Sequence, residues 1–446
     1  MPISPEPVQA TRIRYVVLAW ICAAAIVVYI QRTAMGVAAT RIRGDLGLSE
    51  VDMGWVMSGF FWAYGLSQIP MGCVGQFWGS RRGLVVSMLI ASSLCSLVGF
   101  SWGFSSILVF WMGAGIATAG VFPSCMQSIS AWFPRSRLAL PSGLLGSAMS
   151  VGAAISATLT GILLSLHDRF AADADSVLMP WLGAALSWRG VFILYGLPGL
   201  LWAIAFGLWF RNRPAQHPQV NAAELELIVS DQDPINPQRE QGAPIPWSQL
   251  FLGSQMLLLS GQQMFRSAGY AFFGTWFPTY LQKVHDVSIG WSGFLTSIPL
   301  MGVIFGGTLA GWLADWIFNK TGSRRLSRQW LGGGGQLVCA LTVIAAWYAN
   351  DLVITVPLIA LGSIVMAFGG CCSYSVIVEN ARPHVAPAYG MMNMMGNIGA
   401  AVSPVGAGFI AKWYGWEPVL LMYAAFYFLS FCCWVGINPD KKLFTE

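Results

Sequence analysis

Long apolar stretches dominate this sequence and constrain its fold more than any other feature. Each covers about twenty residues or more, which is the length of helix that crosses the hydrocarbon core of a bilayer. Lipid offers the backbone no hydrogen-bond partners, so a spanning segment must be a helix or a strand of a closed barrel. Barrel strands need only about ten residues, so stretches of this length favour helices. The predicted spans are 13–37, 51–77, 84–103, 106–132, 142–166, 189–210, 249–281, 291–317, 329–349, 353–379, 389–411 and 417–437.

The composition agrees with a membrane protein. Apolar residues make up 56% of the chain and charged residues only 10%, whereas about 25% charged residues is usual in soluble domains. The nine cysteines follow none of the spacings of zinc sites or disulfide frameworks, so we interpret them as small apolar packing residues and expect no metal site. The net charge of +5 is scattered in short basic pairs between the spans, so we expect no nucleic-acid partner.

A polar segment divides the predicted spans into two groups of six. Residues 211–248 are rich in Pro and Gln and poor in long apolar runs, which is typical of a linker. We therefore predict an N-terminal six-helix bundle over 1–210, a cytoplasmic linker over 211–248 and a C-terminal six-helix bundle over 249–446. Lys and Arg concentrate in the loops on the side of the N-terminus, which predicts that both termini are cytoplasmic, in the plasma or bacterial inner membrane.

The two groups repeat each other in sequence. Matching residues are separated by a constant shift that changes only at two short insertions. Two similar bundles related by an axis along the membrane normal leave a cavity at their interface near the middle of the membrane, where a substrate can bind. The matching residues are Ser49 and Ser288, Gly54 and Gly293, Ser58 and Ser297, Gly72 and Gly311, Ser80 to Arg82 and Ser323 to Arg325, Arg135 and Arg382, Gly143 and Gly390, and Gly152 to Ala154 and Gly399 to Ala401.

Two loop segments, GCVGQFWGSRR at 72–82 and GWLADWIFNKTGSRR at 311–325, together with the twelve-span repeat, resemble the major facilitator superfamily. Within it, further stretches resemble the anion:cation symporter family, whose members carry sugar acids, aromatic acids and other carboxylates. The resemblance implies an all-α membrane protein with the major facilitator fold. The stretches are 29–32, 54–58 with Phe60, Phe61, Trp62 and Tyr64, 122–123, 132–134, 276–281, and Asn393, Gly396, Asn397 and Gly399.

Several positions depart from the pattern of that family. Gln76 and Phe77 stand where its first loop motif has an Asp followed by a basic residue, so the cytoplasmic charge lock of the first half should be weakened, whereas the counterpart Asp315 is present. Proton-coupled relatives carry acids at the positions of Gln31 and Thr118. The coupling ion, H⁺ or Na⁺, therefore stays open. The gating residues that the loop motifs imply are Asp315, Arg81, Arg82, Arg324 and Arg325.

Two arginines, Arg32 and Arg266, are predicted to lie inside the membrane. An ionised side chain there costs at least ~2.5 kcal/mol, so both need compensation, most simply from an anion in a wet cavity. A guanidinium suits this role because it forms two parallel hydrogen bonds with a carboxylate or phosphate. Arg32 lies late in its span, where its side chain could instead extend to the membrane surface. The resemblance assigns this position to the substrate carboxylate.

Polar side chains near the arginines complete the predicted substrate site. Tyr29 precedes Arg32 by three residues and Tyr270 follows Arg266 by four, so each tyrosine shares a helical face with its arginine. Ordinary hydrogen bonding between helices is the alternative role for each of these side chains. The other predicted substrate-binding residues are Tyr64, which matches a site position of the family, and Asn393 and Asn397, whose amides share one face and suit substrate hydroxyls.

One carboxylate near a span end is a candidate for coupling. Glu379 lies at the inner end of the tenth predicted span, close in sequence to Arg382 and His384. An ion pair with Arg382 is the simpler interpretation. The other is that Glu379 carries a proton in place of the missing family acids.

Together these features predict a secondary active transporter that carries a small organic anion, such as a sugar acid, by alternating access, most simply as an ion-coupled symporter. An exchanger of phosphorylated metabolites or other anions and a transport-inactive sensor on the same fold are the alternatives. No HExxH, GxSxG or Walker pattern occurs, so we expect no enzyme, no catalytic residues and no bound cofactor. The expected partners are the anionic substrate and the lipid bilayer, with the chain acting as a monomer.

Overall fold

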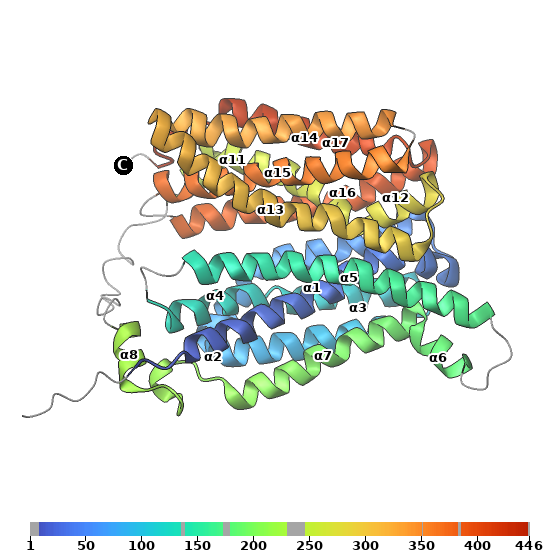
Figure 1. Ribbon diagram of the computed structural model, residues 1–446, viewed down its shortest axis with the longest axis horizontal. Coiled ribbons are helices and arrows are strands. Elements are labelled where there is room, and N and C mark those ends of the chain that lie inside the picture. The colour runs from blue at the N-terminus through green and yellow to red at the C-terminus, as the bar shows by residue number, and fades with distance from the viewer. Residues whose placement is uncertain are drawn as a thin grey trace, which may run out of the picture.

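The chain folds into helices, and no strand occurs in its described part (Figure 1). The structure, a computed structural model, describes residues 9–134, 139–172, 179–229, 246–349, 351–381 and 385–444. The first half contains α1 (Ile13–Leu46), α2 (Glu50–Val98), α3 (Phe104–Thr118), α4 (Val121–Trp132), α5 (Ala139–Ala172), α6 (Met179–Leu186) and α7 (Trp188–Trp209). Next come η2 (Pro214–Gln216), α8 (Ala222–Val229) and α10 (Trp247–Leu252). The second half contains α11 (Ser254–Thr275), α12 (Phe277–Val284), α13 (Ile289–Thr321), the π-helical turn η3 (Arg325–Trp330), α14 (Leu331–Tyr348), α15 (Leu352–Asn380), α16 (Val385–Tyr414) and α17 (Val419–Gly436).

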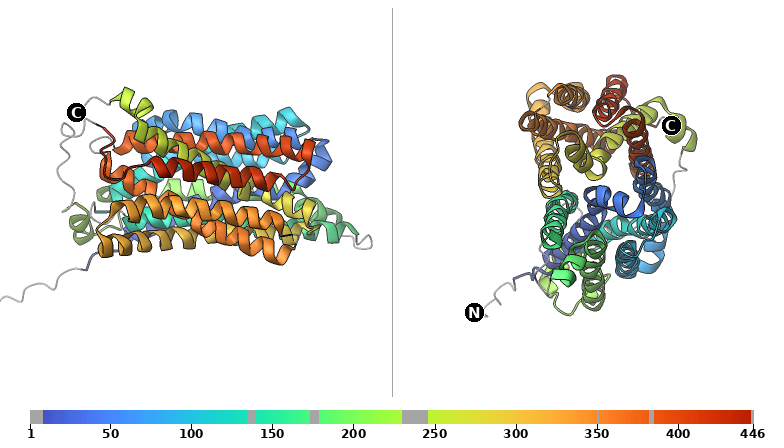
Figure 2. Two further views of the ribbon diagram at one scale, coloured as in Figure 1. Left: turned by 90° about the horizontal axis from the view of Figure 1, so that it is seen from above. Right: turned by 90° about the vertical axis from the view of Figure 1, so that its right-hand side faces the viewer.

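The helices form two groups that face each other. In the end-on view of Figure 2 (right), the helices of the first half, blue to green, lie opposite those of the second half, yellow to red. Across the interface α5 packs against α13, and α2 packs against α16. These two seams enclose the space between α1 and α11.

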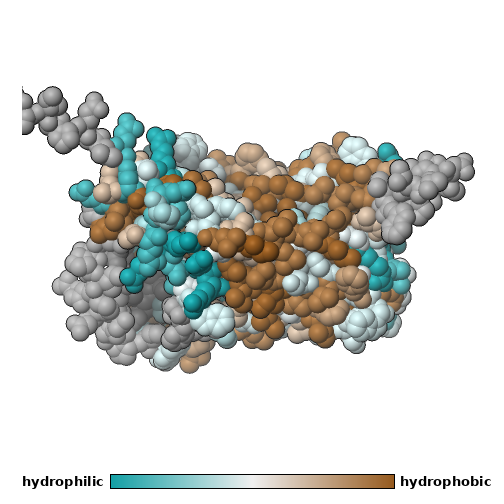
Figure 3. Space-filling model, turned by 90° about the horizontal axis from the view of Figure 1, so that it is seen from below, coloured by the Kyte–Doolittle hydropathy of each residue, from teal (hydrophilic) through white to brown (hydrophobic). Residues whose placement is uncertain are grey.

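Ten helical segments among the described residues are long and apolar enough to cross a membrane. The other two predicted spans, 51–77 and 249–281, fall on the first part of α2 and on α10 to α12, which are also helical. α11 is less apolar because it carries side chains such as Gln262, Gln263 and Arg266. A broad apolar surface separates two polar ends (Figure 3), as a bilayer requires. The predicted all-α membrane fold is confirmed.

Repeated serines start equivalent helices in the two halves. At the start of α2, Ser49 Oγ accepts a hydrogen bond from the backbone N–H of Asp52 at 3.1 Å. At the start of α13, Ser288 Oγ accepts one from the backbone N–H of Trp291 at 3.5 Å. An N-cap serine satisfies a backbone donor that has no partner within the helix. The sequence repeat is therefore also a structural repeat.

Repeated glycines set the two seams between the halves. A Cβ atom added at Gly54 of α2 would lie 2.8 Å from the carbonyl oxygen of Pro404 in α16. One added at Gly293 of α13 would lie 2.2 Å from that of Ala157 in α5. Both distances are too short for a side chain, so only glycine permits this approach.

A second repeated pair of glycines acts within each half. A Cβ atom added at Gly152 of α5 would lie 2.5 Å from the carbonyl oxygen of Ile26 in α1. One added at Gly399 of α16 would lie 2.0 Å from that of Met264 in α11. The glycines thus hold α5 and α16 against the central helices. The repeat pair Arg135 and Arg382 lies outside the described residues.

The two ends of the molecule differ in how closely the halves approach. We call the end that holds the start of α1 and the end of α17 the proximal end, and the opposite end the distal end. At the distal end Thr40 Oγ1 donates to Gln282 Oε1 across the interface at 2.8 Å. Toward the proximal end, Gly146 of α5 and Gly390 of α16 are exposed, and Cβ atoms added there would meet no described atom within 4 Å. The halves are therefore closed together distally and apart proximally.

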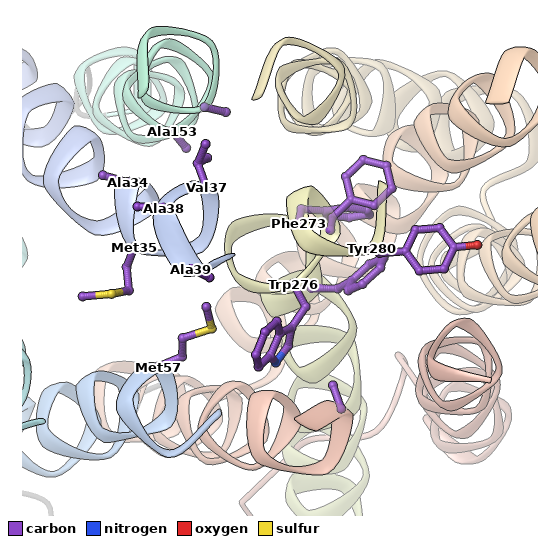
Figure 4. Packing of buried hydrophobic residues seen from close by; sticks show 14 of the residues in the cluster. Ala34, Met35, Val37, Ala38, Ala39, Met57, Ala153, Phe273, Trp276 and Tyr280 are labelled. Atoms are coloured by element: carbon purple, nitrogen blue, oxygen red, sulfur yellow. The ribbon is translucent and has the colours of Figure 1, made fainter. Parts of the chain in front are cut away.

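An apolar core closes the space between the halves on its distal side. Figure 4 shows small side chains of α1, among them Ala38 and Ala39, opposite Phe273 and Trp276 of the second half. All four side chains are buried in one continuous cluster that includes residues of both halves. Such packing excludes water from this side of the interface.

The predicted linker contains a helix, α8, that is fastened to the first half. The fully buried carboxylate of Glu224 in α8 accepts hydrogen bonds from Thr11 Oγ1 at 2.6 Å and from the backbone N–H groups of Ile13 at 3.1 Å and Arg14 at 3.2 Å. Glu224 therefore caps the start of α1, where backbone donors are free and a negative charge is favoured. Residues 230–245 of the linker lie outside the described residues.

Candidate functional site

A cavity of about 230 Å³ lies between the two halves. Pockets for drug-sized ligands usually measure about 300 Å³ or more, so this one suits a smaller molecule. Helices α1 and α2 of the first half and α11, α15 and α16 of the second half supply most of its wall. The structure brings all seven predicted substrate-binding residues to this wall, although their role in binding remains a prediction. They are Tyr29, Arg32, Tyr64, Arg266, Tyr270, Asn393 and Asn397.

Aromatic rings surround the guanidinium of Arg32 on the wall of the first half. Its Cζ atom lies 4.5 Å from the ring centroid of Phe61, 5.3 Å from those of Tyr29 and Phe60, and 5.8 Å from that of Tyr64. Rings within about 6 Å attract a cation through their quadrupole. Within the described part of the chain, no carboxylate forms an ion pair with Arg32. Its N–H groups are therefore free to bind a ligand.

Neutral polar groups hold Arg266 on the wall of the second half. Its Nε and Nη2 atoms donate to Gln263 Oε1 at 3.2 Å and 3.0 Å, and its Nη1 atom lies 3.6 Å from the sulfur of Met366. Gly370 makes room for the guanidinium, since a Cβ atom there would lie 3.2 Å from its Cζ atom. No carboxylate of the described residues pairs with it. Arg266 is thus positioned but not neutralised.

Gln68 of α2 connects the two predicted asparagines of α16 to the first half. Its Oε1 atom accepts hydrogen bonds from Asn393 Nδ2 at 2.9 Å and from Asn397 Nδ2 at 3.4 Å. The Asn397 amide also donates to the backbone oxygen of Asn393 at 3.0 Å. These amides form a polar contact between the halves at the edge of the cavity.

The sequence analysis missed Gln68 and Gln263. Gln68 follows Tyr64 by four residues and Gln263 precedes Arg266 by three, so each shares a helical face with a predicted site residue. This spacing could have identified both. It could not have shown that Gln68 contacts the other half, because that contact joins residues more than 300 positions apart.

The two positions at which the resemblance implies acids lie away from the cavity. The amide of Gln31 is buried and donates to Ser92 Oγ and to the backbone oxygen of Tyr195, both at 3.0 Å. Thr118 is buried at the end of α3. Neither residue lines the cavity. Both positions therefore hold neutral side chains, and the Gln31 amide has hydrogen-bond partners of its own.

The chemistry of the cavity wall favours a negatively charged ligand. No Asp or Glu is among the described residues that line it. Two half-buried guanidinium groups on one cavity wall are costly without a partner of opposite charge. The described residues also contain no cluster of His, Cys, Asp or Glu that could hold a metal ion. A small anion with a carboxylate or phosphate group therefore fits the wall best.

Glu379, the predicted coupling residue, lies in an ion-pair cluster at the proximal end. Its carboxylate accepts a hydrogen bond from Arg328 Nη2 at 3.0 Å and lies 3.8 Å from Arg324 Nε. Arg328 is buried within η3, and π-helical turns occur often at functional sites. The predicted partner Arg382 lies outside the described residues. The role of Glu379 in coupling remains a prediction.

The other predicted gating residues also lie at the proximal end, and their contacts stay within one half. Arg81 Nε donates to the backbone oxygen of Gly207 at 2.8 Å, which ties α2 to α7. Arg325 Nε lies 3.8 Å from Asp440 Oδ2. The exposed gating residues without an ion pair to a described residue are Arg82 and Asp315. The weakened charge lock predicted at Gln76 and Phe77 concerns side chains that lie outside the described part.

Sequence comparison identifies relatives over nearly the whole chain. The family model described as the Major Facilitator Superfamily matches residues 21–386 and 323–445. A probable galactarate/D-glucarate transporter of Escherichia coli is 31% identical over 86% of this chain and 83% of its own length. A D-galactonate transporter of Escherichia coli is 27% identical over 99% of both chains. A probable sulfoacetate transporter of Cupriavidus necator is 27% identical over 91% of this chain and 89% of its own length.

Structural comparison gives the same fold. An inward-facing, occupied crystal structure of a bacterial homologue of the human lysosomal transporter Spinster superposes with a TM-score of 0.75, at 18% identity, over 96% of this chain and 97% of that one. A mutant of the nucleoside transporter NupG superposes with a TM-score of 0.67, at 12% identity, over 94% of this chain and 99% of that one. These similar proteins are transporters and not enzymes, as expected.

Proposed function

The chain belongs to the major facilitator superfamily, and on this basis we propose that it is a secondary transporter that carries a small organic anion, such as a sugar acid, by alternating access. The proposal depends on one observation: Arg32 and Arg266, from opposite halves, line one cavity that contains no described carboxylate. A bound anion would compensate both charges. The relatives named as transporters of galactarate, glucarate and galactonate support a sugar acid as the anion.

In the proposed mechanism, the anion enters from the proximal end, where the halves lie apart. Its carboxylate binds the free N–H groups of Arg32, and its remaining polar groups contact Arg266, Tyr270 and the asparagine amides. Neutralising both guanidinium groups removes the repulsion between the two halves and lets their proximal ends close. The glycine seams at the distal end then open and release the anion on the other side.

The sidedness follows from the predicted topology. With both termini in the cytoplasm of a cell that holds the protein in its plasma or inner membrane, the proximal end faces the cytoplasm. The structure then corresponds to the inward-facing state. In this state the outer side is closed by the contact of Thr40 with Gln282 and by the apolar core of Figure 4.

Ion-coupled symport is the first proposal for the driving force, and exchange of one anion for another is the second. Exchange is favoured by the lack of a described carboxylate on the cavity wall that could carry a proton. Gln31 cannot carry a proton in place of an acid, because its side chain is a neutral amide that donates both of its hydrogen bonds. Glu379 remains the candidate for proton coupling, and its ion pair with Arg328 would have to break when it binds a proton.

Uptake by purified protein in proteoliposomes tests the proposal. Labelled sugar acids, other carboxylates and phosphorylated sugars are offered with and without gradients of H⁺ and Na⁺, and with and without unlabelled anion inside. Saturable uptake of a sugar acid supports the proposal, and acceleration by internal anion identifies exchange. Uptake of phosphorylated sugars alone would replace the carboxylate by a phosphate. Binding of a sugar acid without any uptake would favour the sensor alternative. If the protein neither binds nor takes up any of the anions, the proposal is refuted.

A further inference from the structure

Gln68 lies on the first-half side of the cavity edge, one helical turn beyond the ring of Tyr64, and its side-chain oxygen accepts hydrogen bonds from both asparagines of α16. The function proposed above does not use Gln68. Its position raises the question of what this bond does to the two amides that face the substrate.

An asparagine amide can present either an acceptor or a donor to a ligand. The side-chain oxygen accepts hydrogen bonds, whereas the NH₂ group donates them. An amide that is free to flip can present either its oxygen or its NH₂ group to the ligand, so it does not distinguish a carboxylate from a hydroxyl group. A fixed amide selects, because a buried polar group without a matching partner is costly.

Gln68 fixes the orientation of both amides. Because its Oε1 atom can only accept hydrogen bonds, the groups that face it must be donors, so the NH₂ groups of Asn393 and Asn397 point toward α2. Their side-chain oxygens then point elsewhere, and no described residue donates a hydrogen bond to either of them. Both residues line the cavity. The oxygens are thus left as acceptors for a ligand.

Close packing holds this arrangement from both sides of α16. A Cβ atom added at Gly65 of α2 would lie 3.0 Å from the Cβ atom of Asn397, so α2 approaches that residue directly. On the opposite side, a Cβ atom added at Gly396 would lie 2.9 Å from Ser267 Oγ of α11. The α16 backbone is therefore held between the two helices that carry Gln68 and Arg266, and its amides have little freedom to move.

We infer that Gln68 is a positioning residue that sets the substrate class: it turns the oxygens of Asn393 and Asn397 toward the cavity, so that the site prefers acids that carry hydroxyl groups over acids that do not. This inference rests on the proposed function. The guanidinium groups supply the donors that a carboxylate needs, and the asparagine oxygens supply the acceptors that hydroxyl groups need. Anions without hydroxyl groups leave these acceptors unpaired.

Competition by matched acids tests the inference. D-gluconate and hexanoate have the same carbon number and charge and differ only in hydroxyl groups, as do D-glucarate and adipate. The ratio of inhibition constants within each pair, measured against uptake of a labelled sugar acid, reports the preference for hydroxyl groups and is insensitive to the amount of folded protein. The wild-type protein should favour the hydroxylated member of each pair.

Three variants separate positioning from simple helix packing. Gln68→Met removes the acceptor and should lower the preference about tenfold, which is the effect of losing roughly one hydrogen bond. Gln68→Glu keeps an acceptor for both amides, so it should weaken both acids of a pair through its added charge and leave the ratio unchanged. Ser67→Ala changes the neighbouring residue of α2, which forms no hydrogen bond to the asparagines among the described residues, and should behave as wild type.

The outcomes distinguish the inference from the proposed function. If Gln68→Met weakens both acids of a pair equally, Gln68 only holds helices together and the inference is wrong, while the transporter proposal stands. If Gln68→Met changes neither the affinities nor the ratio of inhibition constants, the inference is also wrong and the transporter proposal again stands. If the wild-type protein takes up no organic acid, the proposed function fails and the inference fails with it.

Discussion

The two walls of the cavity carry one arginine each, but they hold it in different ways. On the first-half wall, Arg32 lies among the rings of Tyr29, Phe60, Phe61 and Tyr64, which attract its charge without accepting its hydrogen bonds. On the second-half wall, the Gln263 amide already accepts two hydrogen bonds from the other arginine. The first wall therefore leaves the N–H donors of its arginine unpaired, whereas the second holds its arginine in place through hydrogen bonds.

This difference develops on a frame that is the same in both halves. Ser49 and Ser288 cap equivalent helices, and Gly54 and Gly293 bring equivalent helices into contact with the opposite half. The repeat thus preserves the residues that determine helix ends and close approaches. The two arginines do not cap helices or set close approaches, so their surroundings can differ between the halves.

The largest effect is expected from breaking the shared frame. Gly54→Leu and Gly293→Leu place a side chain where a Cβ atom already lies 2.8 Å or 2.2 Å from a carbonyl oxygen of the other half. The distal end then cannot close, so uptake in proteoliposomes should fall to background for both variants. Gly44→Leu is the control, since a Cβ atom there meets no atom within 4 Å. Normal uptake by either seam variant would show that transport does not require this close approach of the halves.

Lysine substitutions sharpen the contrast between the two arginines. Arg32→Lys keeps the charge but removes the paired N–H donors that the ligand uses, so the dissociation constant for a sugar acid should rise about 100-fold. Arg266→Lys should raise it only about tenfold, because part of that guanidinium is already bonded to Gln263. Calorimetric titration of both variants in detergent gives the order. The reverse order would mean that the second-half wall, not the first, binds the carboxylate.

The aromatic wall can be tested through its closest ring. Phe61→Leu removes the ring that lies 4.5 Å from Arg32 Cζ, and the lost cation–π attraction should weaken binding about threefold to tenfold. Phe61→Tyr keeps a ring at this place and should retain most of the affinity. Equal affinities for wild type and Phe61→Leu in the same titration would show that the ring does not position the guanidinium.

The smallest effect is expected outside the membrane, at an aromatic contact beside the first half. The His217 ring lies 4.7 Å from that of Trp209 and 5.7 Å from that of Trp132. Burial, and next the Arg211 guanidinium, hold the pKa of His217 below its ordinary value of 6.5. The folded protein therefore favours neutral His217.

The sign of the resulting pH dependence follows from this shift. The stability that neutral His217 contributes is fully present above pH 6.5, where His217 is neutral in the unfolded chain as well. It is lost as the pH falls from 6.5 toward the lower pKa of His217 in the folded state. Melting temperatures measured above and below pH 6.5 should show a smaller drop for His217→Gln than for wild type. An equal drop in both would assign the pH dependence to other groups.

The sequence predicted the frame well because the frame depends on local or repeated signals. Span length predicted the all-α fold, and the repeated serines and glycines predicted two similar bundles with a cavity between them. The charges of Arg32 and Arg266 inside the spans then indicated that both line this cavity, as the structure shows. Contacts between distant segments were not predictable. The bond of Gln68 to Asn393 and the cap that Glu224 provides for α1 each join residues more than 200 positions apart, and no local pattern indicates them.

Direct binding of a labelled sugar acid to purified Arg32→Ala and Arg266→Ala, with circular dichroism to verify folding, tests the central claim most closely. If the two guanidinium groups hold the anion from opposite halves, each variant should lose about 100-fold or more in affinity, since Arg32→Ala removes a charge-assisted pair of hydrogen bonds and Arg266→Ala removes the second positive charge beside the anion. Affinity equal to that of the wild-type protein in both folded variants would contradict the account.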